Sequence, residues 1–176
     1  MSDDTYLEIH LFGPIETVET LEKIIFSLND HNLYPEGMSH EDNFKMRDAE
    51  YIKKGFRNAV AHNCNPYFTN PECYYGNIDG LEELLQELKI PYHFTYFEGS
   101  EYPGMIKAWK PDTGLHEEMR MFCEPALSIG DLRKILSQDN HIWDLHDWIR
   151  EAELAQGTEM GSFSVSDEVR EWLIAA

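Results

Sequence analysis

Three strand-like segments follow one another along the chain with only short turns between them, and this succession constrains the fold most strongly. Residues 92–97 alternate between two faces, and similar segments cover residues 105–109 and 115–123. Gly and Pro residues mark the connections at 99–104 and 111–114. Because consecutive strands joined by short turns pair antiparallel, the sequence predicts an antiparallel meander rather than a parallel sheet.

Helical periodicity dominates most of the remaining chain. Apolar residues recur at three- and four-residue spacing over residues 15–28, 45–60 and 81–88, and again in three segments after residue 128. An alternating strand at residues 6–12 precedes the first helix. This order predicts an α+β fold in which helices pack on an antiparallel sheet, with a ferredoxin-like sandwich as the specific topology.

The length of 176 residues suits one domain with a real core. We predict an α+β core domain over residues 1–138 and a helical C-terminal extension, residues 139–176, packed on the same domain. Pro66, Pro71 and Gly76 interrupt residues 63–77, so this segment is predicted to be a long loop with a short strand near its end.

The charge balance excludes several classes of function. Acidic residues outnumber basic ones 33 to 14, which gives a formal net charge of −19. Direct nucleic-acid binding needs clustered Lys and Arg, and anionic membranes also select basic surfaces, so neither is expected. No stretch approaches the roughly 20 apolar residues of a membrane span, and the polar start predicts a cytoplasmic protein. Three cysteines, an odd number, favour reduced thiols over a disulfide framework.

Familiar catalytic and nucleotide-binding motifs are missing from the sequence. It contains no GxGxxG, GxxxxGK[ST], GxSxG, HExxH or CxxC pattern. The best metal-like group is His62 and Cys64, with Cys73 nine residues later and Cys123 far away. Structural zinc sites use closely spaced ligand pairs, so we interpret these residues as loop side chains and small buried thiols. The sequence therefore predicts no metal, no cofactor and no catalytic residue.

Carboxylates are concentrated at the two ends of the chain. Residues 1–42 hold ten acidic side chains against one basic one, and residues 137–176 hold nine against two. Residues three or four apart share a helix face, so seven carboxylates are predicted to form stripes. The stripe members are Glu16, Glu19, Glu83, Glu87, Asp144, Asp147 and Glu151. Neighbours in a stripe are about 4.5–6 Å apart along the helix axis. Such rigid rows of charge can compete with DNA phosphates for a basic groove.

Two further segments can contribute contacts. Tyr67, Phe68, Tyr74, Tyr75 and Trp143 are predicted to form a protein-binding patch, since Tyr and Trp dominate binding hot spots. Such rings also cover the edges of small cores, and both interpretations stay open. Residues 45–57 are basic in an otherwise acidic chain, and their role is left open.

In size and charge, the chain resembles the small acidic DNA-mimic inhibitors that phages and plasmids carry, such as anti-restriction proteins. That resemblance implies a non-enzymatic inhibitor that binds a basic, nucleic-acid-binding protein partner. The alternative is a small enzyme or a ligand- or metal-binding domain. Its cleft would lie on the sheet and use His93, His116 and Glu118, or a metal near His62 and Cys64.

Overall fold

The computed structural model describes residues 4–35, 49–74, 78–97, 104–121, 124–125, 129–137, 141–155 and 160–175. The strands are β1 (Asp4–Leu11), β2 (Gly13–Ile15), β3 (Tyr34–Pro35), β4 (Tyr67–Tyr74), β5 (Tyr92–Tyr96), β6 (Gly104–Lys110), β7 (Gly114–Met121), β8 (Glu124–Pro125) and β9 (Phe163–Val165). The helices are α1 (Val18–Asp30), α2 (Ala49–His62), α3 (Asp79–Glu87), α4 (Ile129–Leu136), α5 (His141–Ala155) and α6 (Asp167–Ile174).

The described strands form a seven-stranded sheet in the order β3-β4-β1-β5-β6-β7-β8, in which every neighbouring pair is antiparallel. The α+β prediction and the predicted meander, β5 to β7, are therefore confirmed. The ferredoxin-like topology is not found, because its β-α-β-β-α-β order of elements is not the order in this chain, although β4, α3 and β5 do form one split β-α-β unit around β1. Along the chain, two helices, α1 and α2, come between β1 and β4. The second helix reverses the chain direction once more, so β4 pairs antiparallel with β1.

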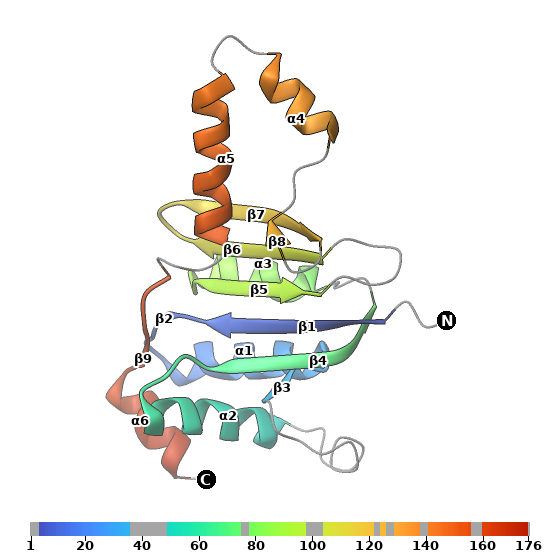
Figure 1. Ribbon diagram of the computed structural model, residues 1–176. Coiled ribbons are helices and arrows are strands. Elements are labelled where there is room, and N and C mark those ends of the chain that lie inside the picture. The colour runs from blue at the N-terminus through green and yellow to red at the C-terminus, as the bar shows by residue number, and fades with distance from the viewer. Residues whose placement is uncertain are drawn as a thin grey trace.

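Helices α1 and α3 lie behind the sheet in the view of Figure 1, and α2 lies below β4 beside α6. The apolar residues of β1, Leu7, Ile9 and Leu11, are fully buried in the core that these helices cover. Helix α1 contributes Leu21, Ile24, Ile25 and Leu28 to that core, as its periodicity predicts. Helices α4 and α5 form a hairpin that rises beyond β7, away from this core (Figure 1).

Residues 67–74 form a strand, so the prediction of a long loop is wrong for this segment. Strand β4 pairs with both β1 and β3. Phe68 on this strand is fully buried. Pro71 falls where the β1–β4 register shifts, between the pairs at Asn70 and Cys73. A proline is tolerated at such an irregularity, so it does not end the strand.

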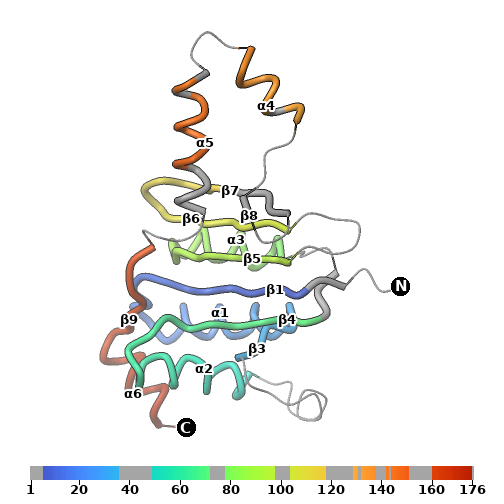
Figure 2. Tube along the Cα trace, viewed as in Figure 1, coloured from blue at the N-terminus to red at the C-terminus, as the bar shows by residue number. Residues whose placement is uncertain are grey.

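The end of the chain returns to its beginning. Strand β9 pairs parallel with β2, and the red C-terminal tube runs back to the body in Figure 2. Helix α6 contacts α2, where the Arg57 Nε donates a 2.7 Å hydrogen bond to the carbonyl of Leu173. Ser166 caps α6 by accepting a hydrogen bond from the Val169 amide. The division at residue 138 stays a prediction.

Candidate protein-binding surface

Six exposed carboxylates and one exposed aromatic ring lie on or next to α1 and α3, two helices that contact each other. We call this surface the α1–α3 acidic face. It consists of Glu16, Glu19, Glu22, Asp30, Glu83, Glu87 and Phe26. Glu16 precedes α1, the next three carboxylates lie on α1, and the last two lie on α3, which contacts α1. Three carboxylates from the predicted stripes, Glu19, Glu83 and Glu87, therefore lie on two neighbouring helices, and Glu16 lies just before α1.

Charges on the two helices influence each other. The Lys23 ammonium pairs with Glu19 on α1 at 2.7 Å. This hydrogen bond and charge raise the pKa of Lys23, and Glu87 on α3 raises it further. Glu19 is therefore locally compensated. Glu22, Asp30, Glu83 and Glu87 make no ion pair among the described residues.

The position of α3 depends on a buried polar contact. Glu82 is only 7 % exposed and accepts hydrogen bonds from the Tyr92 hydroxyl at 2.9 Å and from the Lys107 ammonium at 3.1 Å. Tyr92 and Lys107 belong to adjacent strands of the sheet. Leu81 and Leu85 are buried beside them. These contacts fix which side of α3 faces the sheet, and so direct Glu83 and Glu87 outward.

Phe26 is the most exposed large hydrophobic residue among the described ones, at 72 %. Beside it lies a groove of about 510 Å³ between α1 and α3, whose lining includes Glu22, Phe26, Asp30, His31 and Leu84. An aromatic ring that borders a groove on a charged surface is typical of a contact anchor. The sequence analysis missed Phe26. The signal was available, since Phe26 interrupts the polar side of an otherwise amphipathic helix.

The remaining predicted carboxylates lie elsewhere. Asp144 and Asp147 are on α5, where Asp147 is exposed and Asp144 is half-buried. Glu151 and Trp143 are also on α5, but their side chains lie outside the described ones. Because α5 stands apart from α1 and α3 (Figure 1), the predicted carboxylates form two surfaces rather than one.

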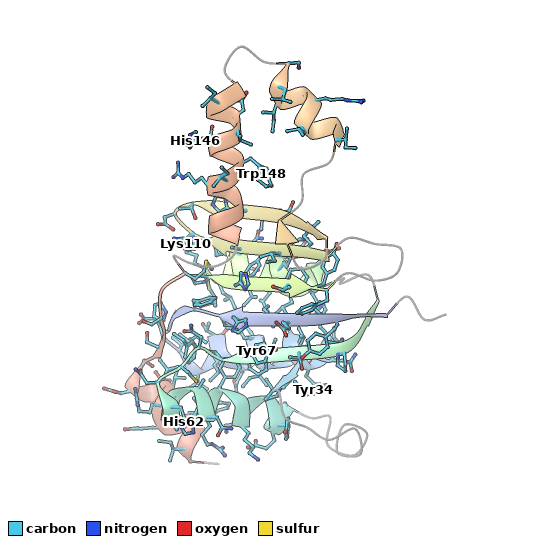
Figure 3. All side chains as sticks on the ribbon, in the orientation of Figure 1. Tyr34, His62, Tyr67, Lys110, His146 and Trp148 are labelled. Carbon is cyan, nitrogen blue, oxygen red and sulfur yellow. The ribbon has the colours of Figure 1, made fainter. Side chains whose placement is uncertain are left out.

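The α4–α5 hairpin exposes an unexpected number of aliphatic side chains. They are Ile129, Leu132 and Leu136 on α4, and Ile142, Leu145 and Ile149 on α5, each at least 40 % exposed. In each helix the spacing i, i+3, i+7 places the three on one face. The helical periodicity is confirmed, but the burial that it normally indicates is not found here. Figure 3 shows His146 and Trp148 on the same projecting helix.

The predicted aromatic patch is wrong for Phe68, which is fully buried in the core. Tyr67 points to the opposite side of the strand and is half-buried, and its hydroxyl donates to Glu8 at 2.7 Å (Figure 3). The side chain of Tyr74 lies outside the described ones, and Tyr75 lies outside the described residues. A clustered aromatic surface therefore has no support from these residues.

The face of the sheet opposite α1 and α3 carries a row of imidazoles. The strand registers place Tyr67, His10, His93, Ala108 and His116 directly across β4, β1, β5, β6 and β7. The rings of His10 and Tyr67 are 4.5 Å apart, and those of His10 and His93 are 6.1 Å apart. Burial lowers the pKa of His10, although Glu8 partly opposes this.

This row places His93 and His116 on the same face of the sheet, with Ala108 between them, and it also contains His10 and Tyr67, which sequence reasoning missed. Glu118 lies on β7, and its side chain is outside the described ones. Among the described residues, no group of three His, Cys, Asp or Glu side chains is placed to hold a metal ion, at His62 and Cys64 or elsewhere. The enzyme alternative stays a prediction.

No family model matches the chain, and neither curated proteins nor solved structures give a significant match. None of the helices in the described part of the chain is long and apolar enough to cross a membrane. Function is therefore argued from the surfaces above.

Proposed function

We propose that the protein is a non-enzymatic binding protein whose α1–α3 acidic face occupies a basic surface on a protein partner. The observation that supports this most is that two adjacent helices carry these carboxylates together with the exposed Phe26. We further propose that the basic surface is a nucleic-acid-binding groove, in which the carboxylates take the place of phosphates. Occupying that groove would inhibit the partner.

The geometry suits such a target electrostatically. On α3, Glu83 and Glu87 are four residues apart, about 6 Å along the axis, whereas Glu22 and Asp30 on α1 are eight residues apart, about 12 Å. Packed helices lie about 8–10 Å apart, so the carboxylates of α1 and α3 lie on two neighbouring helices. Fields from such charges accelerate association with a basic partner and weaken as salt is added. With Glu19 paired to Lys23, the field comes mainly from Glu22, Asp30, Glu83 and Glu87.

Phe26 adds affinity that salt does not remove. A ring that is 72 % exposed in the free protein has apolar area to bury against the partner. Burying a Phe side chain is worth about 1.5–3 kcal/mol. The proposed surface therefore combines a charged rim with one apolar anchor, which is the usual composition of a protein interface.

The test compares matched charge variants. The face variant is Glu22→Gln/Glu87→Gln, and the control is Asp112→Asn/Glu171→Gln, which removes two exposed carboxylates elsewhere. Each protein is immobilised and exposed to a cell lysate at low salt, and captured proteins are eluted with a salt gradient. We expect the same basic protein to leave the face variant at lower salt than it leaves the wild type or the control. Equal elution from all three would contradict the proposal.

A further inference from the structure

A second groove lies on the other side of Phe26, between α1, α2 and α6. Its volume is about 300 Å³, and its lining includes Glu22, Ile25, Phe26, Asn29, Lys53 and Trp172. Three of these side chains are large and apolar, and one is a cation. We call it the Lys53 groove. It is distinct from the 510 Å³ groove between α1 and α3, although both share Phe26 and Glu22.

Lys53 is unusual because it is more than nine-tenths buried, at 8 % exposure. Its ammonium nitrogen lies 3.6 Å from the centroid of the Trp172 ring. Within the described part of the chain, no carboxylate lies within 4.0 Å of that nitrogen and it makes no hydrogen bond. Glu50, at the same groove, is paired with Arg57 at 3.5 Å.

The Lys53 side chain is buried, but its ammonium nitrogen is not among the described polar atoms that are sealed from solvent, so an anion in the groove can reach an ammonium whose contact is an aromatic face. The cation–π contact recovers part of the cost of removing the charge from water, but a carboxylate would recover more. The neighbouring Lys54 is exposed, and its ammonium lies farther from an aromatic ring, at 5.8 Å from the Tyr51 centroid. Lys53 therefore provides a binding group for an anion that enters the groove.

We propose that the Lys53 groove binds a small monocarboxylate with an apolar body. The carboxylate pairs with the Lys53 ammonium, and the apolar body lies against Trp172, Phe26 and Ile25. A single negative charge is favoured over a phosphate dianion because the Glu22 carboxylate borders the same groove. The volume is at the small end of the range for ligand sites, about 300–1,000 Å³. This inference does not rest on the proposed protein-binding function, although Phe26 and Glu22 border both surfaces.

The carboxylate can belong to a free acid or to the C-terminal residue of a peptide. The probes are therefore 3-phenylpropionate, hexanoate and a tetrapeptide that ends in phenylalanine, each paired with its neutral amide. Binding is measured by isothermal titration calorimetry and by saturation-transfer NMR on the full chain. We expect each acid that binds to do so at least about tenfold more tightly than its amide, which corresponds to about 1.4 kcal/mol. Binding of the free acids identifies small molecules as the source, and binding of the peptide alone identifies a chain terminus.

Lys53→Met removes the charge and keeps an unbranched apolar side chain, and Lys54→Met is the matched control. We expect at least a tenfold loss of affinity in the first variant and none in the second. If Lys53→Met does not fold, the comparison of acid and amide affinities on the wild-type chain still tests the proposal. The proposal is overturned if no acid binds at about 10 mM, a level that detects very weak sites. It is also overturned if acids and amides bind equally, or if Lys54→Met loses as much affinity as Lys53→Met.

Discussion

Lys107→Met should destabilise the protein by removing the cation from a buried ion pair. The Glu82 side chain is 9 % exposed and that of Lys107 is 19 % exposed, and their charged atoms are 3.1 Å apart. Removing one partner of such a pair leaves an uncompensated buried charge, which costs about 3–5 kcal/mol. Glu82 keeps its hydrogen bond from Tyr92, and solvent still reaches part of Lys107. We therefore expect a loss of unfolding free energy at or below the lower end of that range, about 2–3 kcal/mol.

The pKa of Lys107 indicates that this pair is favourable. Burial alone would lower it, but Glu82 and Glu117 raise it, and the net result is above the ordinary value of 10.5. For a raised pKa, the stabilisation is fully present below the unfolded value and is lost as pH rises through the folded value. Urea unfolding should therefore show that wild-type protein loses this contribution above about pH 10.5, whereas Lys107→Met has none to lose.

The assay is urea unfolding at pH 7, followed by far-UV circular dichroism. Lys54→Met, at an exposed position, should change stability by less than about 0.5 kcal/mol. The double variant Lys107→Met/Glu82→Gln removes both charges and keeps an acceptor for Tyr92. It should recover at least about 1 kcal/mol of the loss, because no buried charge is left unpaired. A single-variant loss below about 0.5 kcal/mol, or no recovery in the double variant, would refute this reasoning.

Three further predictions concern packing and pH. Burial lowers the pKa of His10, so the wild-type protein loses unfolding free energy as the pH falls below about 6.5. In His10→Gln this loss is removed, so the unfolding free energy should fall less between pH 7.5 and 5.5 than it does in the wild type. Urea titrations at the two pH values check this. Gly55→Ala should lower the melting temperature despite its better helix propensity, because the added Cβ would lie 2.6 Å from Pro35 Cγ; a rise would contradict the packing. Phe68 is fully buried and Phe26 is exposed. Phe68→Ala should therefore lower the unfolding free energy in urea by about 3–5 kcal/mol and Phe26→Ala by under about 0.5 kcal/mol, and equal losses would contradict this difference in burial.

Local patterns predicted the elements whose structure depends on nearby residues. The spacing of Leu21, Ile25 and Leu28 predicts a helix with one buried face, and α1 has that face. Strands β5 to β7 follow from their alternation and short turns. Strand β4 was missed because Pro66 and Pro71 are strong local turn signals. The pairing with β1 comes from a distant part of the chain, and it accommodates Pro71 at a register shift.

The surfaces were less predictable because they depend on how elements meet. Alternation alone does not give strand register, so the sequence could not place His10 beside His93. Lys53 follows the apolar Ile52, but its burial results from Trp172 on α6, which returns from the end of the chain. Helix periodicity correctly placed Glu19 and Glu87 on outer faces, and only the packing of α1 on α3 brought those faces together.

The central claim is that the α1–α3 acidic face occupies a nucleic-acid-binding groove. The most direct measurement is competition by duplex DNA for a protein that the immobilised chain has captured at low salt. We expect that one basic protein is retained and that DNA displaces it. Displacement from the Glu22→Gln/Glu87→Gln variant should need a lower DNA concentration than displacement from the wild type. Capture of no specific protein, or of a protein that saturating DNA leaves in place, would contradict the claim.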